Sequence, residues 1–201
     1  MASFLHHFRR HDPTLHGVVR LIGPYTLKPQ RNRFGMLVRS IISQQISMAA
    51  ARTIRQRLEG LLGDEGLRPA AIAELKPDQL RGVGLSKQKA AYISDLAHKV
   101  ADGTVPLARI GRLNDEQVID TLTQVKGIGR WTAQMFLIFS LGRLDVFPVD
   151  DLGVRVAIGR LYDLGEKPSK DELHEIGLRW SPFATVGSWY CWRYLDHQRK
   201  K

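Results

Sequence analysis

Only one cysteine, Cys191, occurs in the 201-residue chain, and this scarcity excludes several classes of protein. A single thiol cannot form an internal disulfide, so the fold cannot depend on a disulfide framework. It also cannot supply a four-cysteine zinc site or a cysteine-ligated iron–sulfur cluster. The fold must therefore be stabilised by a hydrophobic core, for which 43% hydrophobic residues are sufficient.

Long apolar runs are also absent. The longest mostly apolar, uncharged stretch runs from Trp131 to Gly142, and a membrane span needs roughly 20 residues. The first ten residues contain no basic segment followed by an apolar one, so we expect no secretory signal. These absences predict a soluble protein without membrane partners, which would be cytoplasmic and nucleoid-associated in a bacterium and nuclear in a eukaryote.

Acidic residues are scarce relative to basic ones. The chain has 20 Asp and Glu residues against 30 Lys and Arg residues, which gives a formal charge of +10. Such a surplus favours a polyanionic partner through long-range attraction and counterion release. Because the basic residues are dispersed along the chain, the charge alone is equally consistent with a solvated basic surface.

The apolar residues recur at helical spacing in successive short segments. Asp12-Pro13 is typical of a helix start, and Ser86 and Asp115 are expected to cap two further helices. Gly23-Pro24 is expected to end the first of these helices. No segment shows a persuasive alternation of apolar and polar residues. The pattern therefore predicts an all-α fold.

Residues 122–133 have the sequence Leu-Thr-Gln-Val-Lys-Gly-Ile-Gly-Arg-Trp-Thr-Ala, which indicates a helix, a tight turn and a second helix. Glycines in the turn permit positive φ, and unpaired N–H groups at the new helix can hold a phosphate oxygen. A Gly-x-Gly triplet alone can simply join two helices. With its flanking residues, the segment resembles the helix-hairpin-helix motif, and the residues expected to contact the DNA backbone are Lys126, Gly127, Ile128, Gly129 and Arg130.

Two adjacent carboxylates follow this segment. Asp150 and Asp151 come shortly after the rigid Pro148, at the expected start of another helix. Helix N-capping explains one aspartate readily but both less readily. Because adjacent residues at a helix start point in different directions, we expect one to cap the helix and the other to face a cleft.

These motifs together resemble the helix-hairpin-helix DNA glycosylase superfamily, and within it the AlkA/Mag family of alkylated-base glycosylases. Two further stretches fit this family: Ile42-Ser-Gln-Gln-Ile-Ser, followed by three alanines at 49–51, and Trp180-Ser-Pro-Phe, followed by Trp189-Tyr-Cys-Trp-Arg. The resemblance extends from about Asp12 to Arg193. It departs at the front, where the chain has no room for the β-rich domain of the longer AlkA form.

The resemblance implies a two-lobed helical bundle that acts as a single catalytic unit over residues 1–201. The central lobe is expected at about 33–145, with the helix-hairpin-helix at 115–139. The second lobe is expected to combine about 12–32 with 146–201. The catalytic aspartate would lie in the cleft between the lobes.

By the same resemblance, the chain is expected to be a monofunctional DNA glycosylase for alkylated purines such as 3-methyladenine and 7-methylguanine. Asp151 would be catalytic, with Asp150 as the alternative. A carboxylate near C1′ stabilises the oxocarbenium-like sugar and can orient or deprotonate the attacking water. Trp131 stands where bifunctional members carry a lysine, and tryptophan has no amine to form a Schiff base, so no lyase activity is expected.

Further residues receive roles from the family pattern. Gln44 and Gln45 stand where family members insert a wedge into the gap left by the flipped base, although hydrogen bonding at a helix end would also explain two glutamines. Aromatic faces favour cationic bases, while core packing is the alternative for each tryptophan. The residues expected to line the base pocket are Trp131, Trp192, Met135 and Leu152.

No cofactor is expected to be required for the reaction. The resemblance suggests a structural Na⁺ or K⁺ on the main-chain carbonyls of Thr123, Val125 and Ile128. The expected partner is double-stranded DNA containing alkylated bases, bound by a monomer. Two alternatives are a non-catalytic helix-hairpin-helix binder of distorted DNA and a basic domain that bridges proteins. The second alternative leaves the spacing of the motifs unexplained.

Overall fold

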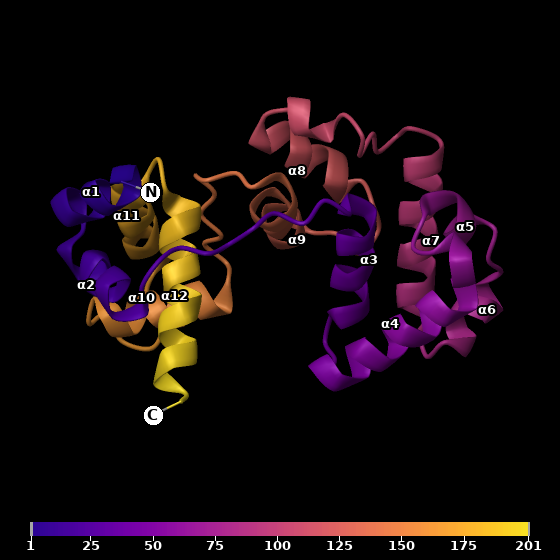
Figure 1. The fold of residues 1–201 in the computed structure, drawn as a ribbon, viewed down its shortest axis with the longest axis horizontal. Coiled ribbons are helices and arrows are strands. Elements are labelled where there is room, and N and C mark those ends of the chain that lie inside the picture. Colours follow the sequence, from indigo (N-terminus) through magenta and orange to yellow (C-terminus); the bar gives the residue numbers. More distant parts are fainter. Residues whose placement is uncertain (1, 201) are drawn as a thin grey trace. The chain divides into compact units, whose positions relative to one another are not determined.

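The computed structural model describes residues 2–200, and over these residues the chain forms helices and no strand (Figure 1). The all-α prediction is confirmed. The chain divides into two compact units: one joins the residues up to Pro29 with those from Gly142 onward, and the other is Gln30–Leu141. The lobe boundaries expected from the sequence, about 33 and 145, differ from these by three to four residues. Residues 2–11, which the sequence analysis assigned to neither lobe, form a helix of the first unit.

The first unit contains five helices among the described residues: α1 (Ala2–His11), α2 (Pro13–Ile22), α10 (Leu152–Leu161), α11 (Lys170–Trp180) and α12 (Ala184–Gln198). Helix α12, yellow in Figure 1, packs against α2, α10 and α11. Its buried face contributes Tyr190 and Cys191 to a core that also includes Phe8, Leu15 and Trp180. This core holds α10 and α12 side by side.

The second unit contains α3 (Arg33–Ser43), α4 (Met48–Leu62), α5 (Pro69–Ala73), α6 (Pro77–Gly82), α7 (Lys87–Ala101), α8 (Asp115–Thr123) and α9 (Arg130–Phe136). Two short 3-10 turns, η1 (Gly63–Glu65) and η2 (Ile110–Arg112), join them, and a π-helical segment, η3 (Leu137–Leu141), continues α9. Helix α7 packs against α3, α5 and α6. The core of this unit includes Leu37, Ile41, Ile93, Leu122 and Phe136, all fully buried.

Most of the expected helix starts are where the sequence placed them. Asp12 caps α2 by accepting a hydrogen bond from the backbone N–H of Leu15, and Ser86 caps α7 in the same way. The expected cap at Asp115 is wrong, because Asn114 caps α8 and forms a reciprocal capping box with Gln117. Asparagine and aspartate cap helices about equally well, so the sequence does not decide which of the two adjacent residues is the N-cap.

None of the helices described over residues 2–200 is both long enough and apolar enough to cross a bilayer. The apolar stretch from Trp131 to Gly142 is instead α9 with η3, and its side chains from Ala133 to Ile138 are buried in the second unit. Its hydrophobicity therefore reflects core packing.

Candidate active site and DNA-binding residues

Asp151 is the N-cap of α10 and the most enclosed of the predicted site carboxylates. Its Oδ1 atom accepts a hydrogen bond from the backbone N–H of Val154 at 2.9 Å and another from the indole Nε1 of Trp192 at 2.8 Å. Its own N–H donates to the carbonyl of Pro148 at 2.9 Å, which closes a tight turn before the helix. With 8% of its surface exposed, the carboxylate is both oriented and partly withdrawn from solvent.

Asp150 has a different environment. Its carboxylate forms an exposed ion pair with Lys170, with 2.9 Å between Nζ and Oδ1. The hydrogen bond from Lys170 lowers the pKa of this carboxyl group. The sequence predicts that one aspartate caps the helix and the other faces a cleft. In the structure the cap is Asp151, the residue expected to be catalytic, and Asp150 is exposed.

Trp192 lies beside Asp151 because α12 packs against α10. Gly153 makes the approach possible, since a Cβ there would lie 3.0 Å from Cδ1 of Trp192 and 3.2 Å from Oδ1 of Asp151. The sequence indicates stacking or core packing for Trp192 and gives no sign that its indole N–H donates to the carboxylate. The two residues are 41 positions apart, and no local pattern reveals the contact.

The other predicted pocket residues differ in exposure. Trp131 and Met135 are on α9 in the second unit, whereas Leu152 begins α10 in the first. Trp131 is 43% exposed and Leu152 is 74% exposed, so both present apolar surface. Met135 is only 6% exposed and belongs mainly to the core of its unit.

The hairpin between α8 and α9 is tightly built. Gly127 has φ +80°, and a Cβ there would lie 2.0 Å from Cδ2 of Tyr92, so only glycine fits. The N–H of Ile128 donates to the carbonyl of Val125 at 3.1 Å, and the N–H of Lys126 donates to Asp95 at 2.9 Å. These two N–H groups are therefore occupied within the chain, whereas the sequence analysis treated the N–H groups of the turn as a seat for phosphate.

Arg130 also has a partner that the sequence analysis missed. Its guanidinium forms two hydrogen bonds with the carboxylate of Glu116, at 2.9 and 2.5 Å, on an exposed surface. The hydrogen bond from Arg130 lowers the pKa of Glu116. A phosphate would therefore compete with Glu116 for Arg130. The side chain of Lys126 is exposed to solvent.

The two candidate wedge residues are clearly distinguished. Gln44 is half-buried at the end of α3, and its Nε2 donates to the carbonyl of Gly127 at 2.8 Å. Gln45 is exposed and has φ +56°, in the left-handed region that non-glycine residues rarely adopt. Hydrogen bonding therefore accounts for Gln44, and Gln45 is the residue with an available side chain.

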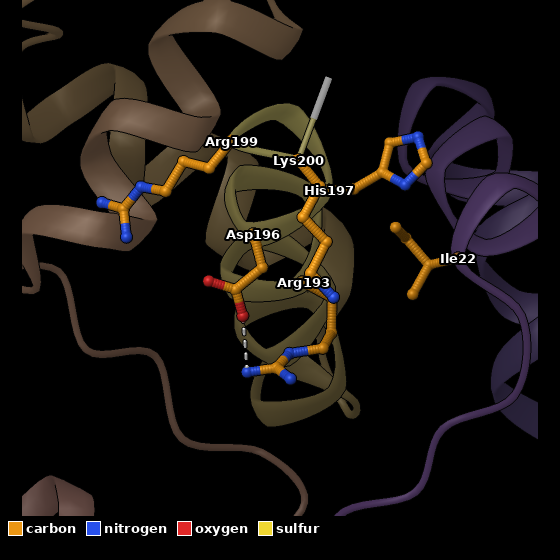
Figure 2. Close-up of a pocket in the computed structure, with 6 residues that line it drawn as sticks. All are labelled: Ile22, Arg193, Asp196, His197, Arg199 and Lys200. Atoms are coloured by element: carbon orange, nitrogen blue, oxygen red, sulfur yellow. Dashed lines mark ion pairs between the residues drawn. The ribbon is translucent and has the colours of Figure 1, made fainter.

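Figure 2 shows a pocket at the C-terminal end of α12 in which Arg193 and Asp196 form an ion pair of 2.9 Å. None of the site residues expected from the sequence lines this pocket. Within residues 2–200 there is also no group of three or more His, Cys, Asp or Glu side chains placed to hold a metal ion.

Comparison with known proteins gives a consistent result. A profile of the family described as "HhH-GPD superfamily base excision DNA repair protein" matches residues 38–182. DNA-3-methyladenine glycosylase 1 of Schizosaccharomyces pombe is 34% identical over 183 residues, which cover 88% of this chain and 79% of that protein. Relatives differ in length, and the chain spans only 59% of YfjP of Bacillus subtilis, to which it is 34% identical over 169 residues.

Solved structures share the fold. The crystal structure of a DNA-3-methyladenine glycosidase from Bacillus halodurans matches with a TM-score of 0.91 and 34% identity, covering 100% of this chain and 92% of that one. The Mag1 3-methyladenine DNA glycosylase of Schizosaccharomyces pombe, in complex with abasic DNA, matches with a TM-score of 0.83 and 32% identity over 96% of both chains. These matches confirm the expected fold.

Proposed function

Because the chain belongs to the HhH-GPD superfamily of base excision DNA repair proteins, we propose that it is a monofunctional DNA glycosylase that removes alkylated purines, such as 3-methyladenine and 7-methylguanine, from duplex DNA. The relatives and solved structures at 32–34% identity bear the name of this activity. The observation that carries the proposal is the Asp151 carboxylate, oriented by Val154 and Trp192 and only slightly exposed.

Asp151 acts on the deoxyribose of the everted nucleotide. The bond between C1′ and the base nitrogen breaks, and the base takes the electron pair. The carboxylate stabilises the positive charge that develops on the sugar, and a water oxygen then bonds to C1′ and loses its proton toward the carboxylate or solvent. Partial burial strengthens this electrostatic interaction, since fewer water dipoles screen it.

The orientation of Asp151 contributes to this role. Hydrogen bonds from Val154 and Trp192 both fall on Oδ1, so they fix the plane of the carboxylate before a substrate binds. A charged group that is already oriented needs no reorganisation at the moment when charge develops. Trp192 is therefore a positioning residue that acts through Asp151.

Trp131 acts on the base. Trp131 is 43% exposed, so part of its apolar surface can contact a base. A purine alkylated on a ring nitrogen is cationic, and a cation is attracted to the face of an indole ring. The same positive charge makes the base a good leaving group, so strong acid catalysis at the base is unnecessary. Since Trp131 cannot form a Schiff base, the product is an intact abasic site.

DNA contacts come from the second unit. Gln45 fills the gap left by the flipped base, and Lys126 with Arg130 contacts phosphates. Na⁺ or K⁺ would be held by carbonyl oxygens of Thr123, Val125 and Ile128, which are suitable donors for such ions. Val125 also accepts from Ile128, so it would share its second lone pair. The protein acts on its DNA as a monomer.

An assay on a panel of duplexes, each with one defined lesion, tests this function. We expect the free alkylated base to be released, and we expect strand breaks to be seen only after alkali converts abasic sites into nicks. Strand cleavage without alkali would contradict the monofunctional assignment. Tight binding to lesion duplexes with no release of any base would instead support the non-catalytic binder.

A further inference from the structure

One face of α7 contacts both of the loops to which the proposed function assigns DNA binding. The residues on this face are Lys89, Tyr92, Asp95 and Lys99, which follow one another at intervals of three, three and four positions. Residues at these intervals lie along the same side of a helix. At one end of the stripe is the turn at Gln44 and Gln45, and at the other is the hairpin between α8 and α9.

Lys89 binds the turn at Gln44 and Gln45, which we call the wedge turn. Its ammonium group donates to the carbonyl of Ile42 at 2.8 Å and to the carbonyl of Gln44 at 2.5 Å. The carbonyl of Ile42 lies in the last turn of α3, and Gln44 is the C-cap residue of that helix. The C-terminal end of a helix leaves C=O groups without partners, and a positive charge is favourable there. Lys89 is half-buried, and the loss of solvent lowers its pKa. Its ammonium group therefore binds backbone carbonyls of the protein itself.

The backbone of Gln45 needs such support. A non-glycine residue in the left-handed region is strained, and it persists there only where its surroundings determine the conformation. Lys89 holds the carbonyl immediately before Gln45, and the side chain of Gln44 ties the turn to the carbonyl of Gly127. Both contacts fix the backbone of the turn and leave the Gln45 side chain exposed.

The same helix also holds the hairpin. The ring of Tyr92 lies over Gly127, and the carboxylate of Asp95 accepts from the N–H of Lys126 and from the ammonium of Lys99. Lys99 also donates to the carbonyl of Gln124 at 2.5 Å. Burial acts against ionisation of Asp95, but these hydrogen bonds outweigh it and lower its pKa. The wedge turn and the hairpin are therefore both held by α7.

We propose that Lys89 is a positioning residue for base extrusion: its ammonium group holds the Gln44–Gln45 turn in the left-handed conformation that presents Gln45 to the duplex. This inference rests on the proposed function, because it takes Gln45 as the wedge. In this proposal Lys89 makes no direct contact with phosphate. The loss of Lys89 should therefore impair extrusion of the base much more than binding of DNA.

The test is a double-mutant cycle with Lys89→Met, Gln45→Ala and the combined variant, with Lys87→Met as the matched control. Lys87 is exposed and lies two residues earlier on the same helix, so its substitution removes the same charge without touching the turn. Single-turnover release of 7-methylguanine is measured on a fully paired duplex and on a duplex that carries the lesion in a bulge. The bulged lesion is already unstacked, so it needs little help from a wedge.

We expect Lys89→Met to slow release from the paired duplex by at least about tenfold, the scale of effect that a misplaced positioning group produces. Release from the bulge should change by less than about twofold, as should both rates for Lys87→Met. The combined variant should be no slower than Gln45→Ala, because Lys89 acts through Gln45. Additive losses, or equal losses on the two substrates, would overturn the proposal.

Two further measurements keep the result interpretable. If thermal melting shows that Lys89→Met is poorly folded, Lys89→Gln, which retains an amide donor, takes its place in the same comparison. Extrusion is also followed without hydrolysis, by the fluorescence of 2-aminopurine placed next to the lesion. Should the wild type release no base at all, the proposed function fails, and the fluorescence still tests Lys89: a Lys89→Met signal equal to that of the wild type would overturn its role.

Discussion

Two buried aspartates in the first unit, Asp12 and Asp151, have closely similar local structures. Each caps a helix through the backbone N–H three residues later, and each accepts the indole N–H of a tryptophan distant in sequence. They differ in their surroundings. Asp12 accepts hydrogen bonds from Leu15 on Oδ1 and from both Tyr162 and Trp180 on Oδ2.

A helix cap is therefore compatible with the catalytic role that we propose for Asp151. Asp12 is 2% exposed and joins α2 to α11 and Tyr162, so its contacts are all structural. Asp151 is followed by Leu152, which is 74% exposed, so it lies where the core meets the surface. The capping bond orients Asp151 and leaves it near the molecular surface.

Cys191 lies near both carboxylates but takes no part in the chemistry. Its thiol is fully buried, and burial, together with the negative charges of Asp12 and Asp151, raises its pKa. A buried thiol with a raised pKa stays protonated and is a poor nucleophile. The single cysteine is therefore a packing residue of the core.

The largest expected effect is that of Asp151→Asn on catalysis. Asparagine also caps helices and keeps an oxygen for Val154 and Trp192, so the fold should be preserved. The negative charge is lost, and release of 3-methyladenine should fall by about a thousandfold. Chromatography of the released base, with DNA binding measured in parallel, checks this. Asp150→Asn is the matched control and should change release by less than about twofold.

Asp12→Ala should lower the stability of the fold and leave the rate of base release unchanged. The substitution removes the cap of α2 and leaves the buried donors of Trp180 and Tyr162 without their acceptor. We expect the free energy of unfolding to fall by about 3 kcal/mol. Urea unfolding followed by circular dichroism measures it. A loss below about 0.5 kcal/mol would contradict the structural role of Asp12.

The two tryptophan partners provide a smaller, paired test. Trp192→Phe removes the indole N–H that orients Asp151, and release of base should slow by about tenfold. Trp180→Phe removes the equivalent donor of Asp12 and should lower stability by about 1–2 kcal/mol without slowing release. Rate and melting measurements on both variants check this, and a slower rate in Trp180→Phe alone would reverse the comparison.

The smallest expected effects concern DNA affinity. Arg130→Gln should weaken binding by a few fold and reduce the salt slope, d log K/d log[salt], by about 0.9, the value for one phosphate contact. Glu116→Gln removes the negative charge that competes with phosphate for Arg130 and should strengthen binding slightly. Titrations at several salt concentrations measure both effects. An unchanged salt slope in Arg130→Gln would contradict a phosphate contact of Arg130.

Much of the helical fold could be predicted from the sequence, because helical periodicity, caps and glycine turns are local signals. The helices around Asp12, Ser86 and the hairpin are examples. The contacts that define the site are not local: Trp192 meets Asp151 across 41 positions, and Lys89 meets Ile42 across 47. Each contact depends on how two helices pack, which a single sequence does not encode in any short pattern. For the same reason, the sequence could propose two glutamines for the wedge but could not distinguish them.

The most direct test of the account compares the two aspartates under one condition. Single-turnover release of 3-methyladenine is measured with saturating enzyme for Asp151→Asn and Asp12→Asn, at a temperature at which both variants are folded. The account predicts that Asp12→Asn retains a rate close to that of the wild type, while Asp151→Asn loses nearly all of it. Equal rates for the two variants, or a rate close to that of the wild type for Asp151→Asn, would contradict it.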